Sequence, residues 1–111
     1  MTINEYQVAA MRTSGKNLTT AEHLLNGALG LTGESGEVAD LVKKSMFQGH
    51  KWDFDHIAKE LGDILWYVAE TATAIGEDLE TIMQMNIDKL MKCYPDGFSS
   101  ERSQNREEGD V

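Results

Sequence analysis

Apolar residues recur at helical spacing in four stretches of this chain. The most regular stripe repeats at every third or fourth position from Leu24 to Ser45. Residues three or four apart lie on the same face of an α-helix. The pattern predicts four helices, over residues 4–13, 19–47, 53–75 and 78–94.

Capping signals lie at the ends of these stretches. Thr19 with Glu22 has the form of a capping box, Asp53 can cap the next helix, and Gly76 can close it. No strand-like alternation and no internal repeat occurs. The sequence therefore predicts an all-α, four-helix bundle-type domain over residues 1–98, followed by a flexible polar tail over residues 99–111.

Four glycines lie inside the longest predicted helix, at positions 27, 30, 33 and 36. Each interior glycine costs a helix about 1 kcal/mol relative to alanine. Close approach of a neighbouring helix or of a ligand would offset this cost. A break in the helix is the alternative, and we favour the continuous helix.

Composition narrows the possible partners. The chain has 111 residues and a formal charge of -9, with its ten basic residues scattered. Nucleic acid and anionic membranes are therefore not expected as partners, and an anionic substrate would need bridging cations. No apolar run could span a bilayer, the first residues do not resemble a secretory signal, and Cys93 has no partner for an internal disulfide. We expect a cytoplasmic protein.

Two carboxylate motifs carry the strongest chemical signal. Glu34 with Glu37, and Glu60 with Asp63, each place two acids on one face of a predicted helix beside its apolar stripe. Like charges about 4 Å apart repel by roughly 4 kcal/mol at an effective dielectric near 20. Either the four acids point apart, as on a solvated face, or a cation lies among them. Two such motifs bordering the core favour the cation.

Oxygen ligands favour a hard cation, so Mg²⁺ is expected and Mn²⁺ is possible. A di-iron site of the ferritin type would need Glu-x-x-His motifs, and neither acid motif has the histidine. The three histidines share no spacing, and we interpret them as caps or surface residues.

Together these residues resemble the MazG-like all-α nucleoside triphosphate pyrophosphohydrolases. The resemblance covers roughly residues 4–98 and includes the runs at residues 30–37 and 59–63 and the Tyr-Pro-Asp-Gly-Phe ending at residues 94–98. It implies magnesium-dependent cleavage of the α–β linkage of a nucleoside triphosphate, with nucleotide housecleaning as the broad role. It also implies that the metal ligands are Glu34, Glu37, Glu60 and Asp63. We assign the attacking water to Glu37, although the sequence alone does not separate base from ligand.

The last predicted helix should supply positive charge for phosphate. By resemblance, Lys89 contacts phosphate and Asn86 is a polar residue nearby. Cys93 departs from the family, which usually has arginine there, and Lys92 is the neighbouring cation that could replace it. A merely solvated Lys89 is the alternative.

A base pocket should contain an aromatic face and a polar edge. Tyr67 shares a helical row with Glu60 and Asp63 and is the first candidate, with Asn26 as a possible amide contact. Trp66 is interpreted as a core residue.

The short chain and its methionine-rich last helix favour a homodimer or homotetramer. Two alternatives to a general triphosphate pyrophosphohydrolase stay open. One is a non-catalytic acidic helical module that binds a protein partner. The other is a related hydrolase specific for dUTP, dCTP or phosphoribosyl-ATP.

Overall fold

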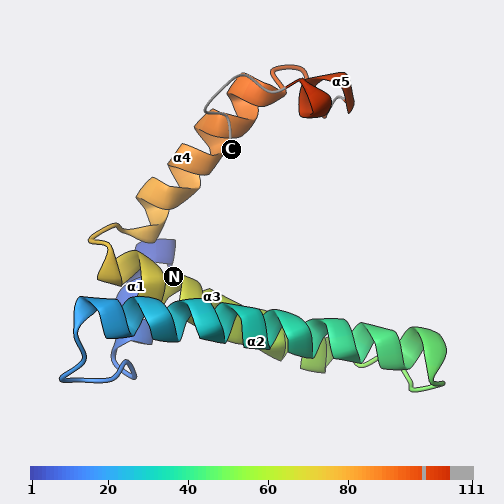
Figure 1. Ribbon diagram of the computed structural model, residues 1–111, viewed down its shortest axis with the longest axis horizontal. Helices are drawn as coiled ribbons and strands as arrows, with labels where there is room; N and C mark the ends of the chain where they lie inside the picture. Colours follow the sequence, from blue (N-terminus) through green and yellow to red (C-terminus); the bar gives the residue numbers. More distant parts are fainter. Residues whose placement is uncertain (99, 106–111) are drawn as a thin grey trace.

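The computed structural model describes residues 1–98 and 100–105, and this part of the chain is all-helical (Figure 1). The helices are α1 (Ile3–Met11), α2 (Thr20–Phe47), α3 (Phe54–Ala74), α4 (Leu79–Cys93) and the short α5 (Ser100–Gln104). The predicted all-α fold class is confirmed, and the four main helices begin and end close to the expected positions. The short α5 falls in the segment predicted to be a flexible tail, while residues 99 and 106–111 lie outside the described residues.

Side-chain caps define where the helices begin. Thr19 and Glu22 form a complete capping box at α2. The Asp53 carboxylate accepts a hydrogen bond from the backbone of His56 at the start of α3. These contacts satisfy amide groups that have no partner within the helix. At the other end of α3, Gly76 adopts a left-handed φ of 78°, which suits a residue without Cβ.

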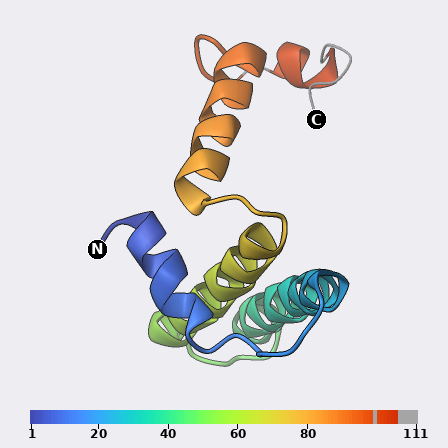
Figure 2. The ribbon, with the colours of Figure 1, turned by 90° about the vertical axis from the view of Figure 1, so that its left-hand side faces the viewer.

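α2 and α3 run side by side in opposite directions and form the body of the molecule (Figures 1 and 2). α2 is continuous through its glycines. A Cβ on Gly27 would overlap Thr71, and one on Gly30 would overlap the ring of Tyr67. These two glycines therefore allow α3 to approach α2 closely. Gly33 and Gly36 have no such neighbour within 4 Å, so helix packing does not explain them.

The buried core of one chain is small. Its hydrophobic members are Ala10, Ala69, Ala72, Leu79 and Cys93. Trp66 fastens α3 to the end of α1 because its indole N–H donates to the carbonyl of Ala10 and the hydroxyl of Thr13, both at 2.9 Å. Trp66 is half-buried and packs against the buried core, in agreement with its interpretation as a core residue.

Large apolar side chains remain exposed on two surfaces. α4 contacts α1 and α3 and then extends away from the α2–α3 pair (Figures 1 and 2). It exposes Met83, Ile87, Leu90 and Met91, and the α2–α3 pair exposes Leu25, Leu29, Leu61 and Leu65. A monomeric protein rarely leaves so much apolar surface uncovered. None of the helices in the described part of the chain is long and apolar enough to cross a membrane.

Candidate metal centre and nucleotide site

The antiparallel packing of α2 and α3 brings acids from both helices to one place. Glu34 of α2 and Glu60 and Asp63 of α3 each offer a carboxylate oxygen, and these oxygens lie within 4.8 Å of one another. Glu34 and Glu60 are half-buried and Asp63 is exposed. The helix pairing thus assembles an oxygen donor set that a hard dication can use.

The neighbouring acids change the ionisation of Glu34. A hydrogen bond with the carboxyl of Glu60, partial desolvation, and the charges of Glu60, Asp63 and Glu37 together raise the pKa of Glu34 to about 7. Two ionised carboxylates this close repel each other, which favours the protonated form of Glu34. A divalent cation would neutralise the same repulsion, and the oxygen donor set therefore fits a metal.

Glu37 lies one turn beyond Glu34 and is not part of this group. Its side chain is exposed, but its charge contributes to the raised pKa of Glu34, so it lies within electrostatic range. Its roles as a ligand and as the residue that orients water stay predictions.

His56 is a neighbour of the acids that the sequence analysis did not single out. Its Nε2 lies 3.2 Å from an oxygen of Glu60, four residues along α3. The sequence could have indicated the contact of His56 with Glu60, because residues four apart lie on one face of a helix.

Tyr67 lies between the two helices beside the acids. Its half-buried ring lies over Gly30 and meets Trp66 edge to face, with ring centroids 5.1 Å apart. Asn26 is exposed, and its amide donates to Glu70 at 2.8 Å. Part of its hydrogen-bonding capacity is therefore already committed within the protein.

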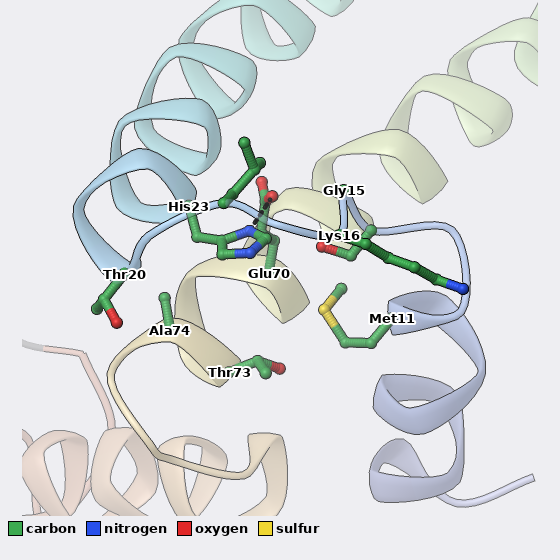
Figure 3. Close-up of a pocket in the computed structure, with 10 residues that line it drawn as sticks. Met11, Gly15, Lys16, Thr20, His23, Glu70, Thr73 and Ala74 are labelled. Carbon is green, nitrogen blue, oxygen red and sulfur yellow. Dashed lines mark hydrogen bonds and ion pairs between the residues drawn. The ribbon is translucent and has the colours of Figure 1, made fainter.

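Glu70 is a buried acid that the sequence analysis missed. Its side chain is 1% exposed and also accepts from Nδ1 of His23 at 3.1 Å. The two residues line a pocket of about 370 Å³ between the α1–α2 loop and the end of α3 (Figure 3). Glu70 continues the row of Asp63 and Tyr67 at helical spacing, and this row was the signal for it. His23 is thus a partner of a buried acid and not a simple surface residue.

The candidate phosphate residues Asn86, Lys89 and Lys92 lie on α4. Because α4 extends away from the α2–α3 pair, one chain does not bring them to the acids (Figure 1). Cys93 is 3% exposed, which agrees with a small residue that fills a packed position.

Comparison with known proteins places these features in a family. The sequence pattern of the MazG nucleotide pyrophosphohydrolase domain matches residues 22–98, which include the acid cluster and Tyr67. The chain belongs to the MazG nucleotide pyrophosphohydrolase family. This MazG domain is also similar to the Gene 37 protein of Mycobacterium phage L5, at 32% identity over 96% of this chain and 100% of the phage protein. No solved structure matches the chain significantly.

Family membership indicates nucleotide pyrophosphohydrolase activity in general terms and a nucleotide substrate. Proteins with a MazG domain generally use a divalent metal, in agreement with the cluster of Glu34, Glu60 and Asp63.

Proposed function

We propose that this MazG domain is a magnesium-dependent nucleoside triphosphate pyrophosphohydrolase that releases a nucleoside monophosphate and pyrophosphate. The observation that carries the proposal is the group of three carboxylates within 4.8 Å, at the seam of α2 and α3. A negative substrate approaching a chain of charge -9 needs cations between the two.

Glu34, Glu60 and Asp63 hold Mg²⁺, or Mn²⁺ in its place, and Glu37 completes the metal site from the next turn of α2. When bound, a divalent cation neutralises phosphate charge, polarises the phosphorus centre and acidifies water. Glu37 orients the attacking water and accepts its proton. The water oxygen bonds to the α-phosphorus, the bond to the bridging oxygen breaks, and its electron pair leaves with pyrophosphate.

The nucleoside lies toward Tyr67 and the pocket at His23. Asp63 and Glu70 are seven residues apart on α3, or about 10 Å along the helix axis. Tyr67 lies between them and supplies an aromatic face for a base. The side chain of Asn26 is held by its hydrogen bond to Glu70. Its remaining amide donor and acceptor groups contact the edge of the base.

A second copy of the chain completes the site. Lys89, Asn86 and Lys92 contact phosphate from α4 of a neighbouring subunit in a homodimer or homotetramer. The exposed apolar residues of α4 and of the α2–α3 pair support this assembly, because burying them against each other removes apolar surface from water.

The biological role that follows is removal of surplus or non-standard nucleotides in the cytoplasm. A narrower hydrolase for dUTP, dCTP or phosphoribosyl-ATP would use the same acids. The exposed apolar faces also fit the alternative of a non-catalytic module that binds a protein partner. That alternative does not explain why three carboxylates converge.

The test is a panel of nucleoside triphosphates, including deoxyribonucleotides and phosphoribosyl-ATP, assayed for pyrophosphate and phosphate separately. We expect pyrophosphate as the product, no turnover with chelator, and recovery with Mg²⁺. Release of phosphate alone, or no turnover of any nucleotide, would contradict the proposal. A thermal melt with and without Mg²⁺ distinguishes the enzyme from the non-catalytic interaction module. A ligand at 100 times its Kd stabilises the folded protein by about 2.7 kcal/mol, whereas the module should show no shift in Tm.

A further inference from the structure

A second pocket lies on the opposite side of the acid cluster from His23, at the loop that joins α2 to α3. Its volume is about 190 Å³. It contains two of the three histidines of the chain and two of its seven lysines. The lining residues are Leu41, Lys44, Ser45, His50, Lys51, Asp53, His56 and Ile57.

Backbone contacts fold the loop against the end of α2. Gly49 has a left-handed φ of 72°, which turns the chain back on itself. The backbone N–H of His50 then donates to the carbonyl of Lys44 at 3.2 Å. The hydroxyl of Ser45 donates to the carbonyl of Lys51 at 3.4 Å. These contacts hold His50 and Lys51 beside the last turn of α2.

The acids near this pocket already have partners. The carboxylate of Asp53 accepts the backbone N–H of His56 at 3.0 Å. Asp40 is 2.8 Å from the ammonium of Lys44. Lys51 takes part in none of the ion pairs formed by the described residues, although it is the cation of the loop. Lys44 is paired with Asp40 and His56 lies against Glu60, so the pocket offers the ammonium of Lys51 and the imidazole of His50, in a chain of charge -9.

The pocket adjoins the acid cluster through one side chain. His56 lines the pocket and its Nε2 is 3.2 Å from Glu60, which belongs to the cluster. His56 and Glu60 are one turn apart, or about 5.4 Å along α3. Phosphates that extend from the cluster toward the loop therefore reach the pocket within about one helical turn.

From these contacts we propose that the pocket at the α2–α3 loop binds the two terminal phosphates of the triphosphate, with Lys51 and His50 as its contacts. The inference rests on the proposed function and gives the substrate a direction along the helix pair. The nucleoside lies toward His23, the scissile linkage at Glu60, and the leaving pyrophosphate at Lys51. Charge-assisted hydrogen bonds from an ammonium and an imidazole are suited to phosphate oxygens.

The kinetic test compares product inhibition in the wild type and in the double variant His50→Ala, Lys51→Ala. We expect KM for the triphosphate and the inhibition constant of pyrophosphate to rise by about tenfold or more, because the variant removes two charge-assisted hydrogen bonds and the loss of one already corresponds to about tenfold. The inhibition constant of the nucleoside monophosphate should stay unchanged, because that product does not reach the loop.

Lys43→Ala is the matched control. Lys43 is an exposed lysine of α2 next to Lys44, also near Asp40 at 3.6 Å, but outside the pocket. The substitution Lys43→Ala removes one positive charge, as Lys51→Ala does, and should leave KM and both inhibition constants unchanged. Equal weakening of both products by the double variant, or the same effect from Lys43→Ala, would overturn the inference.

Direct binding separates this inference from the proposed function. Inorganic pyrophosphate with Mg²⁺ is titrated into protein labelled at histidine, and the ring resonance of His50 is assigned through His50→Gln. We expect this resonance to shift in the wild type and in Lys43→Ala. A wild-type protein without a shift would refute the pocket even if it hydrolyses nucleotides, and a shift without hydrolysis would refute only the proposed function.

Discussion

Glu34 on α2 and Glu60 on α3 place carboxylate oxygens within 4.8 Å of each other, and the interaction with Glu60 is the largest cause of the raised pKa of Glu34, about 7. The contact joins two helices that pack side by side, so it depends on their register. A bound cation would relieve the repulsion between the two carboxylates.

The stability of the metal-free protein should depend on pH. The pKa of Glu34 in the folded protein, about 7, lies above its ordinary value of 4.5. A raised pKa gives the metal-free protein a stability that is complete below about pH 4.5 and is lost as pH rises through about 7. We therefore expect Tm without metal to fall across this window. Mg²⁺ should raise Tm more at about pH 8 than at about pH 5, because proton and metal compete for the same oxygens.

The variant Glu34→Gln serves as the control for that experiment. It removes the titrating group, so the fall of Tm across the window should flatten and the response to Mg²⁺ should weaken. A wild-type Tm that rises through the same window would show that the carboxyls do not meet.

Asp63→Asn should abolish turnover while the helices stay intact. The substitution keeps the size of the side chain and removes one charge from the cluster, so the metal-free protein should be as stable as the wild type or more stable. Glu37→Gln should behave in the same way. Circular dichroism and pyrophosphate release measure the two effects. Asp55→Asn is the matched control, because Asp55 is on the same helix and pairs with Lys59 at 3.1 Å, away from the cluster.

Two glycines of α2 should respond in opposite directions to alanine. Gly30→Ala places a methyl group into the ring of Tyr67 and should cost about 1–3 kcal/mol through overpacking. Gly33→Ala meets no neighbour within 4 Å and should stabilise the helix by about 1 kcal/mol. Urea unfolding of both variants measures the difference. Loss of activity in a stabilised Gly33→Ala protein would indicate that substrate approaches the backbone there.

Glu70 should matter for stability more than any exposed acid. Glu70→Ala leaves Asn26 and His23 without their shared acceptor and should cost about 1–3 kcal/mol. Glu70→Gln keeps one acceptor oxygen and should cost less. Denaturant unfolding tests this order, and the exposed Glu77→Ala should change little. Equal stability of Glu70→Ala and the wild type would contradict the role of the buried acid.

Ile87→Asp should dissociate the protein. Ile87 is exposed on α4 among other apolar residues, and a charge there opposes burial against a second copy. We expect a smaller sedimentation coefficient and lower activity, because Lys89 then no longer reaches the acids of a neighbour. Gln84→Glu adds a charge to a polar position of the same helix and should leave assembly unchanged. A wild-type protein that is monomeric at all concentrations would contradict the shared site.

The secondary structure and the candidate acids follow from patterns that are local in the chain. Helical periodicity, capping boxes and turn residues act between neighbours in the chain, so the limits of α2, α3 and α4 could be predicted. The same local spacing singled out Glu34, Glu37, Glu60 and Asp63, of which the structure groups all but Glu37, and the motifs around them resemble the family to which the chain belongs. It also raised the question of the glycines without saying which of them contact another helix.

The alignment of the helices depends on packing between residues that are far apart in the chain. The register of α2 on α3 depends on the fit of Tyr67 over Gly30, a contact between distant positions that periodicity does not contain. That fit places Glu34 with Glu60 and buries Glu70 against His23. The direction of α4 could not be predicted from the hydrophobic periodicity either, because an amphipathic helix shows which of its faces must be covered but not which surface covers it.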